Sequence, residues 1–207
     1  YLDPVRYISN ESSGKQGYEV ALALKRLGVK TKLILGPSNL IVPQDLKVKK
    51  IVSAKDMMSE VKKSLPVDIA VCAAAVSDFK PLNMKNNKIK KNSIHLENIQ
   101  LEKNPDILDY LSKNNKSRPT IVVGFSAETE NIIKNSKNKI KEKYCDLIVA
   151  NDVSKKDIGF NSEYNKVSII DGGGKIQSIP KNKKSFIANT IAKIILDKLL
   201  KHGRNIN

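Results

Sequence analysis

The sequence predicts an α/β protein with a doubly wound, mostly parallel β-sheet. Short apolar segments alternate along the chain with longer segments whose apolar residues recur at helical spacing. Residues 68–75 and 120–125 are almost continuously apolar, as expected of parallel strands that are covered on both faces. Short polar or glycine-containing stretches join the segments, which is the pattern of repeated βα units.

The strands are predicted from short apolar runs that end at polar or turn-forming residues. The run at 30–35 ends at Gly36-Pro37, and the hairpin is predicted around the glycines of residues 171–174. In chain order, the expected strands are 5–8, 30–35, 50–53, 68–75, 120–125 and 146–150, followed by the hairpin strands 167–170 and 175–179.

The helices are predicted from apolar residues that fall on one helical face. Met57 and Val61 mark such a face in residues 55–65, and Ile187, Ile191 and Ile195 mark it in residues 184–200. The expected helices are 18–27, 55–65, 104–111, 130–143 and 184–200.

Length and charge limit the classes of function. The chain has 207 residues, enough for one domain, and we treat 1–207 as that domain. Its net charge of +16 suggests an anionic partner, but aromatic residues do not alternate with the lysines as on a base-stacking surface, so nucleic acid is not the expected partner. No run approaches the about 20 apolar residues of a membrane helix, so no membrane partner is expected.

Two further features concern the setting of the chain. Cys72 and Cys145 have no metal-ligand neighbours at zinc spacing, so we expect reduced thiols and a cytoplasmic location. The chain begins with Tyr1 rather than Met, as expected of a piece of a longer protein.

Residues 10–17 predict a binding site for an anion. They lie between the strand expected at 5–8 and the helix expected at 18–27, and the first turn of a helix has N–H groups without internal partners. Gly14 has no Cβ to keep a ligand away, and Ser12 and Ser13 offer hydroxyls. The stretch lacks the dinucleotide fingerprint and the P-loop spacing, so an ordinary capped turn stays open as the alternative.

Several polar stretches are expected to meet at one edge of the sheet. In parallel α/β sheets, ligands bind at the carboxyl ends of the strands. The stretches that follow or flank expected strand ends are residues 10–17, 74–78, 104–107, 125–129 and 151–152.

Residues 79–103 interrupt the alternation of strands and helices. Residues 85–91 are too polar to enter a core, and residues 94–101 alternate on both sides of Glu97-Asn98, which predicts a hairpin outside the main sheet. Because a lone hairpin is barely stable in water, we expect it to pair with a second copy of the chain, with the lysine-rich part as a flap.

Motifs spread along the chain resemble one family. Residues 3–15, 73–78, 88–91, 103–107, 124–129, 146–153 and 159–162 read DPVRYISNESSGK, AAAVSD, KIKK, KNPDI, GFSAET, DLIVANDV and GFNS. In this order they are similar to the phosphopantothenoylcysteine synthetase domain of bacterial coenzyme A biosynthesis proteins. The resemblance covers nearly the whole chain and implies a Rossmann-like fold, a homodimer, and a flavin-dependent decarboxylase domain that precedes this domain.

The resemblance also implies a two-step ligation. The carboxylate of 4′-phosphopantothenate attacks the α-phosphate of CTP, pyrophosphate leaves, and the amine of cysteine then displaces CMP. The family implies Mg²⁺ with the triphosphate and no flavin in this domain. Donors that neutralise developing negative charge suit this chemistry, and no nucleophilic side chain is needed.

Site residues follow from the matching motif positions. Asn10 is expected to hold the reacting acyl end, and Lys88 of the flap is expected to stabilise charge in the transition state and to contact the nucleotide. The resemblance assigns the nucleotide to Asp78, Asn104, Pro105, Asp106, Ile107, Phe125, Lys139 and Lys143. It assigns phosphopantothenate to Asn10, Ala74 and Ala75, with Ser12, Ser13 and Gly14 as candidates for its phosphate. The metal ligands are not implied.

Two other classes of function fit the sequence less well. A dinucleotide-dependent oxidoreductase would carry a tighter glycine fingerprint and an acidic residue after the second strand, where residues 36–39 supply none. A nucleic-acid-binding module would depend on charge alone. Pyrophosphate release that requires both CTP and phosphopantothenate separates the ligase from both alternatives.

Overall fold

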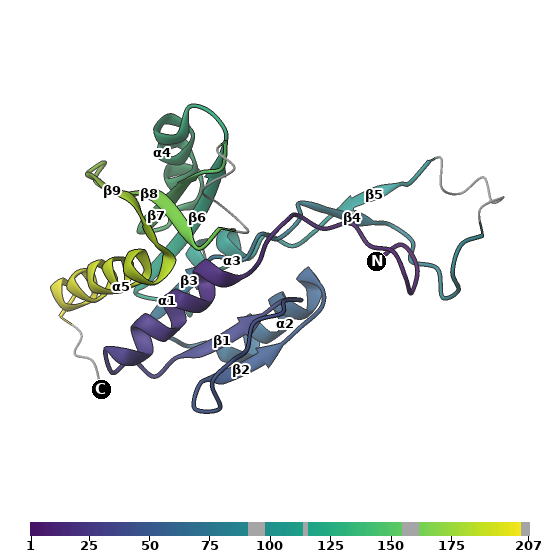
Figure 1. Cartoon of the computed structure of the whole chain (residues 1–207), viewed down its shortest axis with the longest axis horizontal. Helices are drawn as coiled ribbons and strands as arrows, with labels where there is room; N and C mark the ends of the chain where they lie inside the picture. Colours follow the sequence, from purple (N-terminus) through teal and green to yellow (C-terminus); the bar gives the residue numbers. More distant parts are fainter. Residues whose placement is uncertain (91–97, 114–115, 155–161, 204–207) are drawn as a thin grey trace.

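The computed structural model is an α/β structure, described here for residues 1–90, 98–113, 116–154 and 162–203 (Figure 1). Its main sheet has the strand order β3-β6-β7-β8-β9. Strands β3 (Ile69–Cys72), β6 (Ile121–Glu128) and β7 (Leu147–Asp152) run parallel. Strands β8 (Tyr164–Asp171) and β9 (Ile176–Lys183) add an antiparallel hairpin at one edge. The mostly parallel sheet predicted from the sequence is confirmed.

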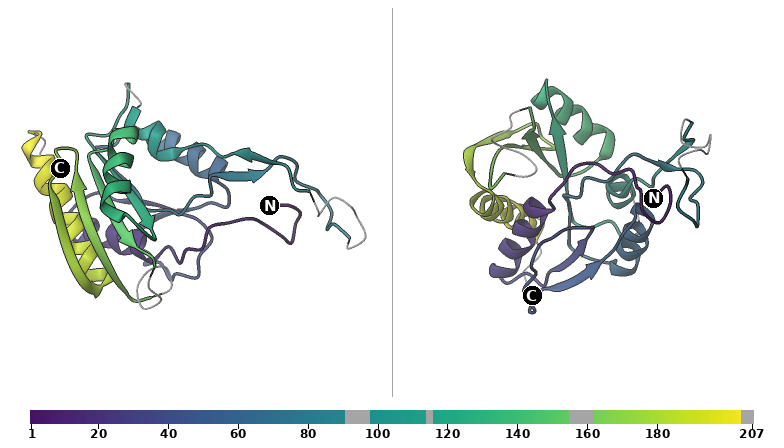
Figure 2. Two further views of the ribbon diagram at one scale, coloured as in Figure 1. Left: turned by 90° about the horizontal axis from the view of Figure 1, so that it is seen from above. Right: turned by 45° about the vertical axis from the view of Figure 1, so that its right-hand side comes forward.

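Helices cover both faces of this sheet (Figure 2). Helices α1 (Lys15–Arg26) and α5 (Lys184–Lys201) pack on one face, and α2 (Ala54–Ser64), α3 (Ile107–Lys113) and α4 (Ile132–Lys143) contribute to the apolar cluster on the other. The alternation of β6 produces this arrangement, because Ile121 and Val123 point into the first cluster and Val122 points into the second. All three are fully buried.

Gly124 lets α3 approach the sheet closely. A Cβ at this position would lie 2.8 Å from a methyl group of Leu108 in α3 and 2.8 Å from one of Ile148 in β7. No real side chain fits at that distance without a shift of its neighbours. The absence of a side chain therefore sets the position of residues 104–107, which lead into α3.

A second, two-stranded parallel sheet is formed by β1 (Lys32–Leu35) and β2 (Lys47–Lys50). The prediction of a single sheet containing these strands is wrong, since among the described residues no ladder joins β1 or β2 to β3. The strand expected at 50–53 lies earlier, at β2. Its apolar Ile51 follows the strand, and the Ile51 N–H donates to the Leu35 carbonyl at 2.9 Å.

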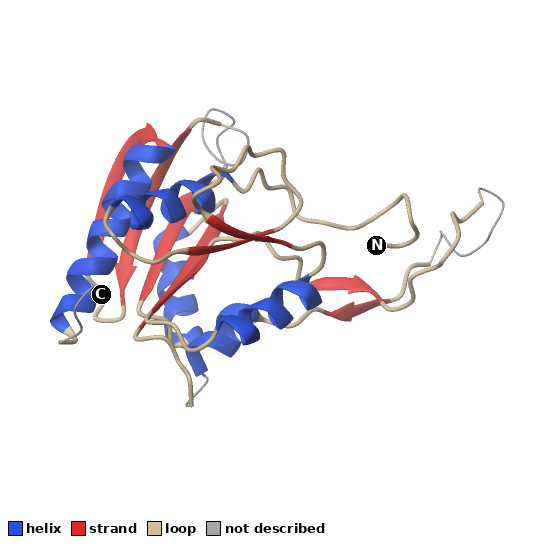
Figure 3. Ribbon diagram, turned by 90° about the horizontal axis from the view of Figure 1, so that it is seen from below, coloured by secondary structure: helices blue, strands red, loops and turns tan. Residues whose placement is uncertain are grey.

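A thin arm extends from the body of the molecule (Figure 1, Figure 3). It contains β4 (Phe79–Pro81) and β5 (Leu101–Lys103), which pair antiparallel, with Phe79 opposite Lys103. We define the arm as residues 79–90 and 98–103. Leu101 pairs with Pro81 across the arm, whereas residues 94–97 and the first half of the hairpin predicted around Glu97-Asn98 lie outside the described residues.

The N-terminal segment, residues 1–9, runs beside the arm in Figure 1 and Figure 3. The strand expected at 5–8 is not present, so this prediction is wrong. The N–H groups of Val5 and Arg6 both donate to the Asp3 carboxylate at 2.9 Å, and the chain turns there. These donors are therefore not available to a sheet.

The remaining elements agree in kind with the prediction and differ in their ends. Helix α1 begins at Lys15, three residues before the predicted start at 18, and the C-terminal hairpin is longer at both ends than expected. Within the described part of the chain, no helix is long and apolar enough to cross a membrane.

Candidate functional site

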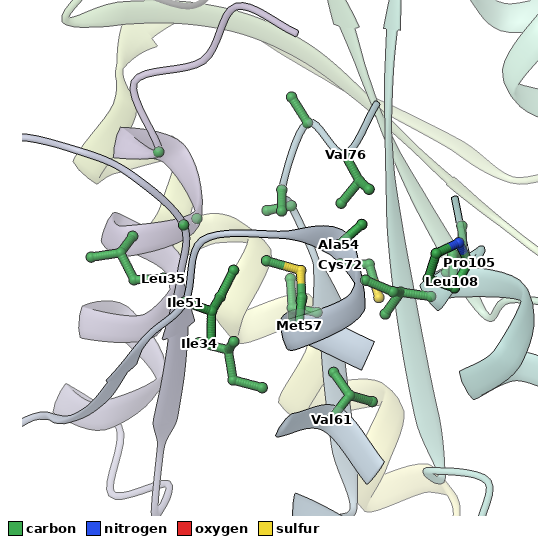
Figure 4. Close-up of a pocket in the computed structure, with 18 of the residues that line it drawn as sticks. Ile34, Leu35, Ile51, Ala54, Met57, Val61, Cys72, Val76, Pro105 and Leu108 are labelled. Atoms are coloured by element: carbon green, nitrogen blue, oxygen red, sulfur yellow. The ribbon is translucent and has the colours of Figure 1, made fainter. Parts of the chain in front are cut away.

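A broad hollow runs along the whole of β1 and β3 and continues past the carboxyl end of β3, and Phe125 of β6 also lines it. Side chains from β1, α2, β3 and α3 give it an apolar floor, including Ile34, Met57, Cys72 and Leu108 (Figure 4). Its lining includes every site residue predicted from the sequence except Ser13 and Lys88: Asn10, Ser12, Gly14, Ala74, Ala75, Asp78, Asn104, Pro105, Asp106, Ile107, Phe125, Lys139 and Lys143.

The start of α1 forms one wall of the hollow. Gly14 precedes the helix with a φ of 70°, a conformation that favours glycine. Its N–H donates to Ser12 Oγ at 3.2 Å, and the Lys15 N–H donates to Ser13 Oγ at 3.4 Å. These contacts shape the loop, and no side chain caps the helix in the usual sense. No acidic residue lies in the first turn, so the turn keeps its favourable field for an anion.

Close packing brings this wall against the end of β3. A Cβ on Gly17 would lie 3.1 Å from the Cβ of Ala73, so α1 depends on two small residues to approach the strand exit. Asn10 then lies over that exit, where its Nδ2 donates to the Val76 carbonyl at 3.2 Å. This bond holds the side-chain amide of Asn10 in one orientation, so its side-chain oxygen has a defined direction. The residue itself is exposed to solvent.

Asn104 joins the exit of β3 to the loop before α3. Its Nδ2 donates to the Ser77 carbonyl at 2.8 Å, and its backbone N–H donates to the Asp78 carbonyl at 2.8 Å. Each such bond contributes about 1 kcal/mol, so the loop that carries Asp78 is held from both sides. Ser77, which sequence reasoning did not select, takes part again because its hydroxyl donates to the Phe79 carbonyl at 2.8 Å. Ser77 lies in the AAAVSD motif and in the stretch 74–78, but no role was assigned to it.

Asp106 has two partners. Its Oδ1 accepts the Asp109 N–H at 2.8 Å and so caps α3, which begins at Ile107. Its Oδ2 accepts from Lys143 Nζ at 2.7 Å. Burial opposes ionisation of Asp106, but these bonds to Lys143 and to the helix N–H lower its pKa overall. The side chain is therefore a carboxylate at neutral pH.

Two lysines of α4 point into the hollow from one helical face. Lys139 Nζ donates to the Phe125 carbonyl at 3.0 Å, and Lys143 Nζ binds Asp106 and, at 3.5 Å, Asp109. The hydrogen bond to Asp106 raises the pKa of Lys143 above its ordinary value, against the opposing effect of burial. Both lysines line the hollow, as expected of residues four apart on one helix.

The chemistry of the lining is that of charge neutralisation. Burial raises the pKa of the Cys72 thiol to about 12, so this thiol is not an activated nucleophile at neutral pH. Among the described residues, no group of three or more His, Cys, Asp and Glu side chains has metal-binding geometry. Magnesium needs only one or two carboxylates when a substrate supplies phosphate oxygens, and the exposed Asp78 fits that requirement.

Two predicted parts lie elsewhere. Lys88 is exposed and does not line the hollow; it lies on the arm, which extends from the body of the molecule in Figure 1. Residues 151–152 do not line the hollow, so the expectation that five polar stretches share it is wrong for this one; Asn151 Oδ1 instead accepts from Asn165 at 3.3 Å. Residues 91 and 159–161 of the quoted motifs are outside the described part of the chain.

Comparison with known proteins identifies the family. Residues 1–199 match the DNA/pantothenate metabolism flavoprotein C-terminal domain. The chain belongs to this family. A relative from Borreliella burgdorferi, named coenzyme A biosynthesis bifunctional protein CoaBC, is 41% identical over 196 residues, covering 94% of this chain and 49% of that protein. A protein of the same name from Vibrio vulnificus is 37% identical over 196 residues, covering 94% and 48%.

A solved structure agrees with this placement in the DNA/pantothenate metabolism flavoprotein C-terminal domain family. The crystal structure of the C-terminal domain of coenzyme A biosynthesis bifunctional protein CoaBC superposes with a TM-score of 0.78 at 30% identity, covering 98% of this chain and 90% of that one. The chain spans about half the length of the curated relatives that it matches.

Proposed function

We propose that this chain is a phosphopantothenate–cysteine ligase that uses CTP in coenzyme A biosynthesis. The observation that carries the proposal is that one hollow gathers the amide of Asn10, the carboxylates of Asp78 and Asp106 and the ammonium groups of Lys139 and Lys143. They come from four parts of the chain: the segment before α1, the segment after β3, the loop before α3, and α4. The names of the family relatives support the pathway, and the geometry supports charge-neutralising chemistry.

The first step forms a mixed anhydride. An oxygen of the phosphopantothenate carboxylate attacks the α-phosphorus of CTP, a new O–P bond forms, and the bond to the β-phosphate breaks to release pyrophosphate. Asn10 donates to the acyl oxygen, and Lys139 and Lys143 neutralise the triphosphate. Lys143 must exchange Asp106 for phosphate oxygens when the nucleotide enters.

The second step forms the amide. The amine of cysteine attacks the acyl carbon, the C–N bond forms, the C–O bond to CMP breaks, and the amine gives up a proton to solvent. Lys88 lies outside the hollow in this structure, so the proposal requires the arm to bring it to a reaction centre, in its own chain or in a second copy. Bound Mg²⁺, held by Asp78 and the phosphates, would reduce the negative charge that the attacking carboxylate meets.

The test separates the two half-reactions. With CTP, Mg²⁺ and 4′-phosphopantothenate but no cysteine, we expect about one equivalent of pyrophosphate per site in a burst, because the acyl-cytidylate stays bound. Addition of cysteine then releases CMP and restores turnover. CTP without phosphopantothenate is the matched control and should release none. Absence of pyrophosphate with all three components present contradicts the proposal.

We also propose that the protein forms a homodimer through the arm. Its exposed apolar side chains include Phe79, Leu82, Met84 and Leu101, with exposed fractions between 46% and 57%. So many apolar groups on a thin projection suit burial against a second copy. Sedimentation equilibrium at micromolar concentration should give the mass of a dimer, and a monomer would contradict this.

We further propose that a flavin-dependent decarboxylase domain accompanies this domain in the native protein.

A further inference from the structure

Asp3 is a carboxylate that lies in the thin N-terminal segment and is nevertheless fully buried, with an exposed fraction of 0%. Its Oδ1 accepts the N–H groups of Val5 and Arg6, each at 2.9 Å. Its Oδ2 accepts Arg6 Nε at 2.9 Å, Arg6 Nη2 and the backbone N–H of Ile89 at 3.1 Å. A buried charge is costly unless it is paired and hydrogen-bonded, and here both oxygens are satisfied.

Both the N–H and the carbonyl of Ile89 take part in the contact with the N-terminal segment. While its N–H donates to Asp3, its carbonyl accepts Arg6 Nη2 at 2.7 Å. A third bond lies nearby, since the Lys85 N–H donates to the Leu2 carbonyl at 2.9 Å. The backbone is thus bonded to the N-terminal segment at Lys85 and at Ile89, on either side of Lys88. The side chain of Lys88 is exposed.

Asp3 is ionised at neutral pH. The hydrogen bonds from Arg6 hold the pKa of its carboxyl far below the ordinary range, against the opposing effect of burial. The group keeps its proton off throughout the neutral range, so its bonds to the arm do not depend on pH there. An asparagine would place an NH₂ group where two donors converge on Oδ1 or where three converge on Oδ2, so an acceptor would be lost.

We propose that Asp3 is a positioning residue for Lys88. By gripping the backbone of Ile89, directly after Lys88, it ties the lysine-bearing part of the arm to the segment that continues to Asn10. Lys88 and Asn10, to which the catalytic roles are assigned, are thus connected through this anchor and residues 3–10. The inference rests on the proposed role of Lys88, but the anchoring itself is independent of that role.

The first experiment follows the anchor without using activity. Hydrogen–deuterium exchange of the Ile89 amide is measured in the intact protein and in Asp3→Asn. We expect the amide to exchange about tenfold faster or more in the variant, since it loses its acceptor. The control Asp45→Asn removes an exposed carboxylate that pairs with Lys25 elsewhere, and it should leave Ile89 unchanged. Unchanged exchange in Asp3→Asn overturns the proposal, whatever reaction the protein catalyses.

The second experiment asks whether Asp3 acts through Lys88. We expect Asp3→Asn to lower kcat by about 100-fold, as a small misplacement of a reacting group does, with KM for CTP changed by less than about twofold. In a Lys88→Gln background the same change should cost less than about threefold, because the group to be positioned is already lost. A full loss in both backgrounds means a general structural role and overturns the proposal.

A second variant keeps the test decisive if Asp3→Asn does not fold. Arg6→Lys retains the positive charge beside Asp3 but cannot bridge Asp3 and the Ile89 carbonyl together, as the guanidinium does. We expect faster exchange at residues 85–90 and the same dependence of kcat on Lys88. If wild type released no pyrophosphate, the proposed function would fail, and the exchange measurement would still decide the anchor.

Discussion

Lys88→Gln is expected to lower turnover by about 100-fold, because an ammonium group that stabilises developing charge in the transition state is replaced by a neutral amide. The melting temperature should change by less than about 2 °C, since the side chain is exposed and surface substitutions usually cost under about 0.5 kcal/mol. The measurement is steady-state release of CMP together with a thermal melt of each protein.

Lys85→Gln is the matched control for this experiment. It removes the same charge from the same stretch of the arm, and its side chain is also exposed. The bond from Lys85 to Leu2 uses the backbone N–H, so it survives the change. Equal losses of turnover in both variants would show that overall charge matters rather than Lys88, and a large fall in melting temperature would mark Lys88 as structural.

Asn10→Asp is expected to lower kcat/KM for phosphopantothenate by about 100-fold. The substitution removes the donor to the Val76 carbonyl and places a negative charge beside an anionic substrate. Two unit charges about 4 Å apart repel by about 4 kcal/mol at an effective dielectric constant of about 20, and exposure to solvent reduces this. Pyrophosphate release at limiting phosphopantothenate measures the effect.

Asn39→Asp provides the control for the charge change. Asn39 is exposed near the same edge of the molecule but is not part of the lining of the hollow. Its kinetics should stay within about twofold of wild type, because a solvated surface charge is strongly screened. Rates at the wild-type level in Asn10→Asp would refute the role of Asn10, and so would a loss of the same size in Asn39→Asp.

The sequence was most informative where burial decides the structure. The run that contains Ile121, Val122 and Val123 can be satisfied only in the interior of a sheet, and β6 lies there. The rule that ligands bind at strand exits, with the resemblance of the motifs, selected residues that the fold brings to one hollow. Their catalytic roles stay predictions.

The errors arose where a local hydrogen bond outweighed the apolar pattern. The mainly apolar residues 5–8 predict a short strand, but the Asp3 carboxylate accepts the N–H groups of Val5 and Arg6. The apolar Ile51 suggested a strand at 50–53, yet its side chain lines the hollow after β2 has ended. Contacts through backbone carbonyls, such as that from Asn104 to Ser77, leave no trace in residue types and could not be predicted.

The pairing of Lys143 with Asp106 bears on which anions the protein retains. An empty hollow already carries an internal counter-charge for this ammonium group, so a weakly charged solute gains little by competing for it. A triphosphate with its several negative charges competes far better than a monophosphate. We therefore expect the nucleoside monophosphate product to be displaced from Lys143 by Asp106. The Lys143–Asp106 ion pair should then form again as the product leaves.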